Sequence, residues 1–508
     1  MLTIDCGTQS VRTMVFDRNG TIIAEKKINF KPYFSLRPGW AEQDPNLYWN
    51  SACEAVRFLT GKDPELRKNI KGIVVTTLRS THVLLDKNGK VLRPSILWLD
   101  QRMTNFIPKL SLMEKITFSL ISMKKTVEII GKQTKANWIK ENEPNIWKKV
   151  YKYMLVSGFF YYKLTGNFVD SVASQIGMIP FNYKKKSWET SSKSWRWRVF
   201  GVERKKLYDL VKPTGTVGYL TVEASKQLLL PKGIPVIAGG SDKGCETIGN
   251  GCINPEIASL SFGTTATIQT TTKKYIEPIR FLPSYPALLP DSYNPEIEIF
   301  RGYWMLKWFE QQFAFKESQE AKKLGMTVEE LLNEKIKDIP PASEGLILQP
   351  YWCPHIKTPQ ARGSIIGFTD VHTKYHIYKA IIEGINYALM EGFEKIKIKT
   401  KTPIKYVVVG GGGSQSDEIC QITADMFGIT VKRVHTHEVS SLGAAISGFV
   451  GLGIYKDFDS AIGSMISYEK VFKPNSSNNL VYKRLYNKVY KRLYSKLKNF
   501  YDFMYVST

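Results

Sequence analysis

The feature that most constrains this chain is a short motif that occurs twice. Residues 5–10 read DCGTQS, and residues 261–266, past the midpoint, read SFGTTA. Each copy leads a short apolar strand into a Gly-Thr turn and out again into a β-branched stretch. Glycine lets the backbone N–H groups of such a turn approach an oxyanion, and the neighbouring hydroxyl groups add donors. The repeated motif therefore predicts a duplicated phosphate-binding hairpin.

Length and patterning predict two domains of the α/β class. A chain of 508 residues is too long for one ordinary hydrophobic core. Strands and helices alternate through the first third, and this pattern restarts after the apolar strand at 235–238. We therefore expect an N-terminal domain at 1–242 and a C-terminal domain at 243–508.

Cysteine spacing and hydropathy indicate in which cellular compartment the protein is expected. The six cysteines are scattered without a Cys-x-x-Cys pair, which favours reduced thiols over disulfides or a zinc site. No apolar run is long enough to cross a membrane, and the sequence starts directly with a strand. We expect a cytoplasmic protein that does not attach to a membrane.

The net charge of +25 raises affinity for polyanions in general. The lysines lie in almost every segment, however, so we interpret them as a basic surface and expect no nucleic-acid partner. A near-repeat at 481–496 predicts an amphipathic helix that closes its own domain, with a membrane-surface or nucleic-acid role as the alternative. Its apolar face comprises Leu485, Tyr486, Val489, Tyr490, Leu493, Tyr494 and Leu497.

Two charged residues flank the first predicted turn. Asp5 ends a buried strand, where a carboxylate can hold Mg²⁺ against the phosphates of a nucleotide. Arg12 follows on the next strand and can reach a terminal phosphate as a fixed positive charge. The alternatives are an aspartate that stabilises the turn and a basic surface residue.

A glycine run, residues 410–413, stands between an apolar strand and a helix. Such a turn lets the backbone lie flat against a base or sugar and exposes the N–H groups at the start of the helix. The chain contains neither a G-x-G-x-x-G fingerprint after a strand nor a Walker lysine. The nucleotide-binding fold is therefore neither a Rossmann fold nor a P-loop fold.

Asp242 is the strongest candidate for a catalytic base. It follows GGS at the carboxyl end of the strand at 235–238, the edge of a parallel sheet where ligands bind. Between the two predicted hairpins, its carboxylate can accept the proton of an attacking hydroxyl group. Asp242 can also serve as the N-cap of the helix that follows, and the two roles are compatible.

These motifs together resemble the FGGY family of carbohydrate kinases over nearly the whole chain. The matching segments are residues 5–12, 40–45, 97–102, 240–242, 261–265, 363–368, 376–383, 410–416 and 441–445. The resemblance implies an actin-like, ribonuclease-H-like fold of two domains, with ATP and Mg²⁺ bound in the cleft between them. It also implies a small-molecule sugar or polyol substrate and a homodimer.

The resemblance further assigns roles by position. Asp242 becomes the general base, and Asp5 with Asp242 the magnesium ligands. The nucleotide ligands become Gly7, Thr8, Gln9, Ser10, Arg12, Gly263, Thr264, Thr265, Gly411, Gly412, Gly413 and Ser416. The acceptor contacts become Arg79, Trp98, Asp100, Asp242 and Lys243.

Departures from the family pattern leave the substrate open. Glycerol kinases carry Arg-Glu where this chain has Arg79-Ser80, and the Met-His pair of xylulokinases is absent there because His82 is offset. A small ketose or polyol, favouring a xylulose-like sugar, is the expected acceptor. Two alternatives remain: an inactive nucleotide-binding regulator with nucleic-acid affinity, and an ATPase of the same fold that needs no sugar.

Overall fold

Two six-stranded sheets organise the chain. The computed structural model describes residues 1–353 and 358–507. The first sheet has the strand order β13-β14-β5-β1-β2-β3, comprising β1 (Leu2–Cys6), β2 (Ser10–Phe16), β3 (Ile22–Asn29), β5 (Ile73–Thr77), β13 (Thr216–Tyr219) and β14 (Pro235–Ile237). The second has the order β19-β16-β15-β22-β23-β24, comprising β15 (Ile257–Phe262), β16 (Ala266–Gln269), β19 (Glu296–Ile299), β22 (Tyr406–Gly410), β23 (Thr430–Val434) and β24 (Tyr468–Phe472).

The two sheets have the same topology. In the first, β1 pairs antiparallel with β2 and parallel with β5. In the second, β15 pairs antiparallel with β16 and parallel with β22. An antiparallel strand closes the far edge of each sheet. The sequence motif that occurs twice is therefore part of a fold that occurs twice.

Burial explains why the central strands are apolar. Strands β5 and β15 are buried along their whole length, as expected for strands covered on both faces, whereas the edge strand β3 alternates between exposed and half-buried residues. Helix α1 (Pro45–Lys62), capped by Asp44, packs on β2 and β3, and α7 (Val156–Thr165) packs on β5. On the second sheet, α14 (Lys374–Thr400) packs on β16 and β19, and α15 (Asp417–Phe427) packs on β23.

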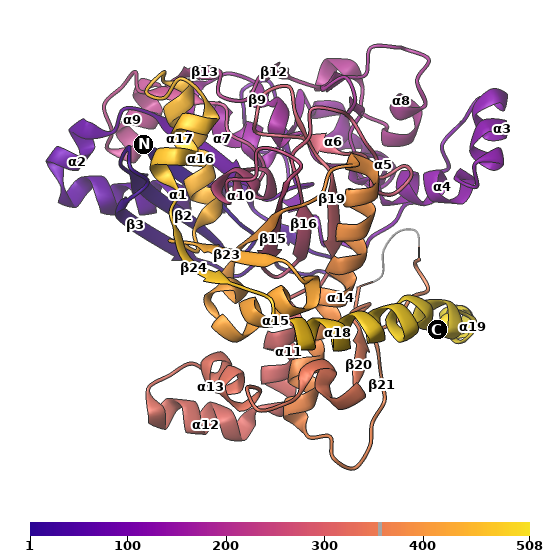
Figure 1. Cartoon of the computed structure of the whole chain (residues 1–508). Coiled ribbons are helices and arrows are strands. Elements are labelled where there is room, and N and C mark those ends of the chain that lie inside the picture. The colour runs from indigo at the N-terminus through magenta and orange to yellow at the C-terminus, as the bar shows by residue number, and fades with distance from the viewer. Residues whose placement is uncertain (354–357, 508) are drawn as a thin grey trace.

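Two helices join the lobes. Helix α10 (Asp242–Gly249) packs against α16 (Val439–Gly451), which also contacts β1 and β5 of the first sheet. Figure 1 shows α16 in yellow among the indigo and magenta elements of the N-terminal lobe. One buried cluster combines Met14 and Val74 of the first sheet with Cys245 of α10 and Leu442 of α16. The lobes therefore share a hydrophobic core.

The smaller elements surround these sheets. The remaining helices are α2 (Pro64–Asn69), α3 (Leu112–Leu120), α4 (Lys124–Gln133), α5 (Lys135–Asn142), α6 (Pro144–Lys149), α8 (Trp195–Phe200), α9 (Val222–Leu228), α11 (Trp304–Phe313), α12 (Phe315–Leu324), α13 (Val328–Lys335), α17 (Phe458–Met465), α18 (Ser476–Leu485) and α19 (Lys491–Ser507). Short paired strands are β4 (Glu42–Gln43) with β7 (Ser95–Ile96), β6 (His82–Leu85) with β8 (Lys152–Leu155), β9 (Val169–Ser171) with β12 (Asp209–Val211), β10 (Phe181–Asn182) with β11 (Ser187–Trp188), β17 (Tyr285–Pro286) with β18 (Tyr293–Asn294), and β20 (Ile347–Gln349) with β21 (Ser364–Ile366).

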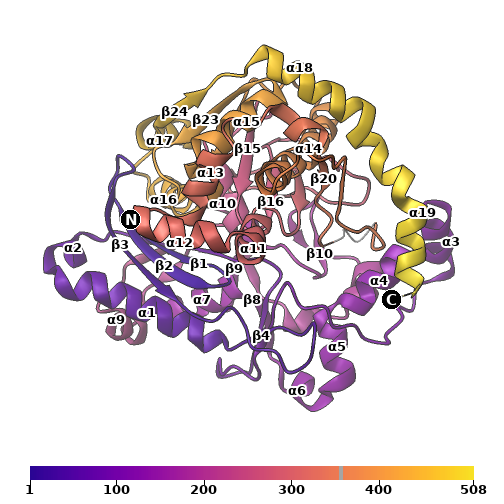
Figure 2. The ribbon, with the colours of Figure 1, turned by 90° about the horizontal axis from the view of Figure 1, so that it is seen from below.

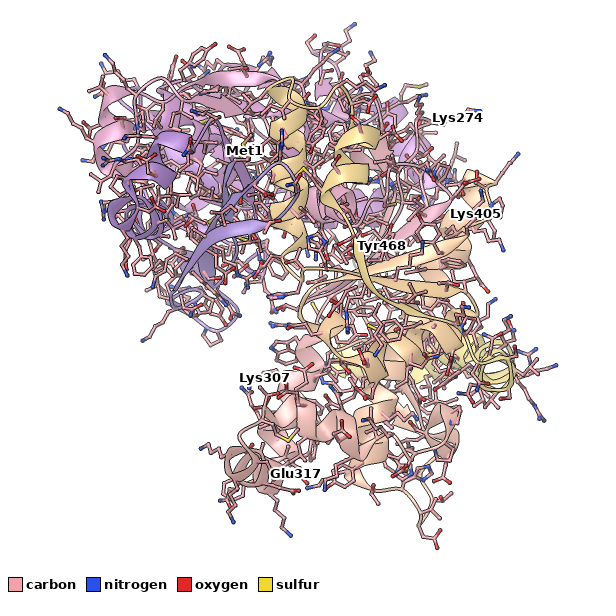
Figure 3. All side chains as sticks on the ribbon, turned by 60° about the vertical axis from the view of Figure 1, so that its left-hand side comes forward. Met1, Lys274, Lys307, Glu317, Lys405 and Tyr468 are labelled. Atoms are coloured by element: carbon pink, nitrogen blue, oxygen red, sulfur yellow. The ribbon has the colours of Figure 1, made fainter. Side chains whose placement is uncertain are left out.

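The C-terminal helices pack on their own lobe. Tyr486 and Tyr490, in a π-helical turn after α18, stack on Tyr387 of α14. Figure 2 shows α18 beside α14 and α15, across the molecule from α1 and β3. In Figure 3, Lys307 of α11 and Glu317 of α12 lie at the end of the C-terminal lobe remote from Met1. No helix within the described residues is both long enough and apolar enough to span a bilayer.

The predicted boundary at residue 242 coincides with the start of α10. Strand β14 of the first sheet ends at Ile237, and β15 of the second begins at Ile257. Helix α10 lies between them and belongs to the core that both lobes share. The division at 242 stays a prediction.

Candidate active site

The first hairpin turns tightly at Gly7. The Gly7 N–H donates to the carbonyl of Ser10 at 3.0 Å, which closes the turn between β1 and β2. The hydroxyl of Thr8 accepts a hydrogen bond from the indole N–H of Trp98 at 3.1 Å. A predicted acceptor residue and a predicted phosphate residue are therefore in direct contact, while Gln9 at the tip is exposed.

Asp5 lies at the centre of an acidic group. Burial raises the pKa of Asp5 to about 7; the charge of Arg12 opposes this shift, and the carboxylates of Glu438, Asp242 and Glu246 reinforce it. One carboxylate oxygen of Glu246 is buried without a hydrogen-bond partner among the described residues. Within residues 1–353 and 358–507, no three His, Cys, Asp or Glu side chains form a group that could hold a metal alone. Mg²⁺ ordinarily takes one or two carboxylates and completes its shell with water and phosphate, which these residues fit.

The glycine turn packs directly on the second hairpin. Gly411 has a φ of +84°, and a Cβ there would lie 3.0 Å from the backbone of Phe262, the last residue of β15. A Cβ on Gly413 would lie 2.9 Å from the ring of Tyr303. At Gly412, by contrast, a Cβ would meet no atom of the described part of the chain within 4 Å. The turn is closed against Phe262 and Tyr303 on one side and open at Gly412, so a planar group has room there.

Ser416 begins helix α15 next to this turn. Its hydroxyl accepts a hydrogen bond from the Ile419 N–H at 3.2 Å and donates to Glu418 at 3.1 Å. Ser416 is therefore the N-cap of α15. The predicted adenosine residues lie in one continuous segment at the start of this helix.

Asp242 is the first residue of α10, but it does not cap the helix. The N-cap is Ser241, whose hydroxyl accepts from the Gly244 N–H at 3.2 Å, so the N-cap alternative for Asp242 is wrong. One oxygen of the Asp242 carboxylate accepts from the Lys243 N–H at 2.8 Å and lies 3.7 Å from Nε of Arg79. The side chain is 34% exposed. This carboxylate therefore has lone pairs open to a ligand.

Arg79 connects the base to the second lobe. It follows β5, and its Nη1 donates to both carboxylate oxygens of Glu296 at 2.8 and 3.0 Å. Its Nη2 lies 3.5 Å from Glu298, on the same strand β19. Burial raises the pKa of Glu298 to about 7, against the opposing charge of Arg79. One cation of the N-terminal lobe is therefore shared by three carboxylates.

Lys243 lies against the second hairpin. Its ammonium group donates to Glu246 at 2.8 Å and to the hydroxyl of Ser261. A Cβ on Gly263 would lie 3.9 Å from the same nitrogen. Although the resemblance placed Lys243 among the acceptor contacts, its charge lies at the predicted phosphate turn.

Short contacts connect the two hairpins. Arg12 of the first hairpin pairs with Glu438, the residue before α16, at 2.9 Å. Within α16, Ser440 donates to the carbonyl of Asp242 at 3.2 Å. The next residue, Lys243, reaches the second hairpin. The two turns, the base and the start of α16 therefore form one contiguous site.

Asp100 differs from the other predicted residues. Its side chain is fully buried; its oxygens accept from the Ala41 N–H at 2.7 Å and from Arg102 at 2.9 Å, and Lys135 lies 3.3 Å away. With these partners, Asp100 has no oxygen free for a sugar. The physical reason is that the loop carrying Trp98 needs a buried counter-charge for Arg102, so the position predicted to bind the acceptor orders the loop instead.

Sequence reasoning missed the acids contributed by distant segments. Glu246, Glu296, Glu298 and Glu438 all lie at the site, and none was predicted. The sequence EIEI at 296–299 carried a usable signal, since alternate residues of a strand point to one face. Nothing local in the sequence marked Glu438 as the partner of Arg12.

A separate cavity of about 830 Å³ lies in the N-terminal lobe. It is lined by Trp188, Trp197 and Tyr208, among others, and includes none of the predicted nucleotide or acceptor residues. Its aromatic walls are far in sequence from the hairpins and Asp242. We therefore do not assign it to the reaction.

Comparisons with known proteins identify the family of this chain. The N-terminal domain of the FGGY family of carbohydrate kinases matches residues 1–249, and the C-terminal domain of the same family matches residues 258–452. A xylulose kinase from Lactococcus lactis is 27% identical over 96% of this chain and 95% of its own length.

Solved structures share the fold. The ligand-bound xylulose kinase from Lactobacillus acidophilus superimposes with a TM-score of 0.82 at 21% identity, covering 99% of both chains. A gluconate kinase from the same organism gives a TM-score of 0.81 at 22% identity, covering 98% of both chains. The predicted α/β fold with two actin-like lobes is confirmed. The protein belongs to the FGGY family of carbohydrate kinases and is an ATP-dependent phosphotransferase with an alcohol group as acceptor.

Proposed function

We propose that the chain transfers the γ-phosphoryl group of ATP to a hydroxyl group of a small ketose or polyol, favouring a xylulose-like sugar. Asp242 takes the proton of the attacking hydroxyl. The observation that carries this proposal is the Asp242 side chain. Ser241 rather than Asp242 caps the helix, the carboxylate is 34% exposed beside Arg79, and the backbone carbonyl of Asp242 accepts a hydrogen bond from Ser440 of the second lobe. The xylulose kinases among the relatives support the choice of acceptor.

The nucleotide occupies the two hairpins and the glycine turn. Its phosphates contact Gly7, Thr8, Gln9, Ser10, Arg12, Gly263, Thr264 and Thr265, and its adenosine contacts Gly411, Gly412, Gly413 and Ser416. Lys243 adds a positive charge beside the second hairpin, where charge develops on the transferred group. Arg12 exchanges its partner Glu438 for phosphate when the nucleotide enters.

Asp5 and Asp242 would hold Mg²⁺, which supplies positive charge for the phosphates when it is bound. The mutual repulsion of Asp5, Glu246 and Glu438 supports this assignment, since a cation relieves it. Arg79 and Trp98 orient the acceptor, the indole through its apolar face. Asp100 positions the Trp98 loop rather than contacting the sugar.

The proposal also covers the cellular location and the oligomeric state. The six cysteines are free, which supports a reducing compartment such as the cytoplasm. A homodimer follows the family expectation and is tested by sedimentation.

Asp242→Asn tests the proposal. A proton acceptor contributes about 10²–10⁴ to the rate, so we expect turnover to fall by about 10³-fold while ATP binding persists. Acceptor-dependent ADP release is measured with pentuloses, hexuloses, tetritols and glycerol. The matched control is Asp338→Asn, an exposed aspartate outside the site, which should leave turnover unchanged.

Each alternative has its own signature. An ATPase of the same fold releases ADP at the same rate with and without any acceptor. An inactive regulator releases no ADP and binds duplex nucleic acid with a steep dependence on salt. Full activity of Asp242→Asn would remove Asp242 from the mechanism.

A further inference from the structure

Strand β19 places two glutamates, Glu296 and Glu298, near Asp242. The two lie at different distances along the strand from the second phosphate turn. In the register with β16, Glu298 lies opposite Thr267 and Glu296 lies opposite Gln269. Since β16 starts from the second hairpin, Glu298 is two residue pairs closer to the phosphate turn than Glu296. Ile297 lies between them on the other face of the strand. The two acids therefore share a face, with Glu298 nearer the transferred group.

Glu296 is buried, and three hydrogen bonds occupy most of its acceptor positions. Its side chain is 4% exposed, and both oxygens accept from Arg79. One of them also accepts from the amide of Gln269, whose carbonyl oxygen is held by the hydroxyl of Thr247 at 2.7 Å. This chain of bonds fixes Arg79 and neutralises its charge, so Glu296 is a positioning residue.

Glu298 has a different environment. Its side chain is 24% exposed, and in the described part of the chain its ion pair with Arg79 at 3.5 Å is its closest polar contact. An ionised carboxylate offers about four acceptor sites, so Glu298 can accept further hydrogen bonds. Arg79 contacts both Glu298 and Asp242, so two partly exposed carboxylates share one cation.

The balance of charge around this space is negative. Arg79 pairs with Asp242, Glu296 and Glu298, and Lys243, which pairs with Glu246, adds a second positive charge near Asp242 and Glu298. A sugar with hydroxyl groups donates to such carboxylates, whereas an acid sugar brings a like charge into a space where four carboxylates surround two cations.

We propose that Glu298 is a specificity-determining residue that accepts hydrogen bonds from the hydroxyl groups of the acceptor, and that the three carboxylates around Arg79 select an uncharged ketose or polyol against a sugar acid. This inference rests on the proposed function of the site. It concerns the part of the site that distinguishes a xylulose-type from a gluconate-type acceptor, and the chain resembles solved structures of both kinds equally well.

The first test compares Glu298→Gln with wild type. The amide keeps the shape but accepts fewer hydrogen bonds, so we expect KM for the best neutral acceptor to rise by 10- to 100-fold, with KM for ATP within twofold of wild type. The matched control is Glu320→Gln on α12, which also removes a glutamate paired with a single cation, at 3.3 Å, but lies outside the site. The control should leave both KM values unchanged.

The second test uses gluconate. Wild type should give a kcat/KM for gluconate at least 100-fold below that for the best neutral acceptor. The double variant Glu296→Gln with Glu298→Gln frees the charge of Arg79 and should shift this ratio toward gluconate by at least tenfold. If the double variant fails to bind ATP in a thermal-shift assay, the single variant Glu298→Gln is used to test the inference. It is judged by the same ratio of kcat/KM for gluconate to kcat/KM for the best neutral acceptor.

Two results would overturn the inference while the proposed kinase function still stands. In the first, wild type prefers gluconate over neutral acceptors. In the second, Glu298→Gln leaves both KM for the acceptor and the acceptor preference unchanged. The proposed function fails separately, through Asp242→Asn with full turnover. Wild type that binds ATP but phosphorylates no acceptor overturns both.

Discussion

His82 is a buried histidine beside the acceptor loop, and it illustrates how one side chain couples pH to stability. Its ring stacks on Tyr153 with centroids 4.4 Å apart and planes 17° apart. Both ring nitrogens are buried without a hydrogen-bond partner among the described residues. Burial lowers the pKa of His82 to about 3, and the charge of Lys135 acts in the same direction. The native ring is therefore neutral wherever the protein is folded.

The expected consequence is a loss of stability in mild acid. The unfolded chain takes up a proton at His82 below a pKa of about 6.5, and the folded chain does so only near 3, so the free energy of unfolding falls as pH drops through this window. At pH 5 this contribution is about 2 kcal/mol. His82→Phe keeps the stacking and removes the proton. The free energy of unfolding is measured in urea at pH 7.5 and at pH 5.0. From pH 7.5 to 5.0, wild type should lose about 2 kcal/mol more of this free energy than the variant does. An equal loss in both proteins would contradict this assignment.

At the scale of elements, the close contact between helices α10 and α16, here called the seam, determines the position of Asp242. A Cβ on Gly443 of α16 would lie 1.9 Å from the carbonyl oxygen of Cys245, on α10. A Cβ on Gly249 would likewise lie 1.9 Å from the carbonyl of Val439. The two helix backbones touch at these glycines. Any larger residue must move α10, and Asp242 with it.

Gly443→Ala should therefore reduce both stability and activity. Overpacking of this kind costs about 1–3 kcal/mol, and the displaced base should lower kcat more than it changes KM for ATP. The matched control is Gly463→Ala in α17, where a Cβ meets no atom within 4 Å. Alanine favours a helix over glycine, so the control should be neutral or more stable by up to about 1 kcal/mol. Thermal melting and steady-state kinetics of both variants provide the comparison.

The elements also show which parts of the site were predictable. The two hairpins, the glycine turn and Asp242 are encoded in contiguous segments, so the sequence revealed them. Glu298 and Glu438 lie far from their partners Arg79 and Arg12 in the chain, and only the folded topology brings them together. The prediction for Asp100 differs from the structure for a related reason. Its sequence neighbours matched an acceptor motif, but Lys135 of helix α5, which is distant in sequence, forms an ion pair with its carboxylate.

At the scale of the whole molecule, the two lobes are joined more closely than two tethered domains. Their shared cluster contains side chains from the first sheet, α10, α16 and the second sheet. Ion pairs cross between the lobes, from Arg12 to Glu438 and from Arg79 to Glu296 and Glu298. Neither lobe can unfold alone without exposing this cluster to water, which costs about 25 cal/mol per Å² of apolar surface. We therefore expect cooperative unfolding of the whole chain.

Calorimetry tests this cooperativity. Wild type should unfold in one transition with equal calorimetric and van't Hoff enthalpies, unlike most chains of two domains. ATP at 100 times its Kd should raise the stability of the whole transition by about 2.7 kcal/mol, since the nucleotide contacts both lobes. Gly443→Ala weakens the seam and should broaden or split the transition, whereas Gly463→Ala should not. Two resolved transitions in wild type, with only one shifted by ATP, would show instead that the lobes are energetically independent and that the nucleotide belongs to one of them.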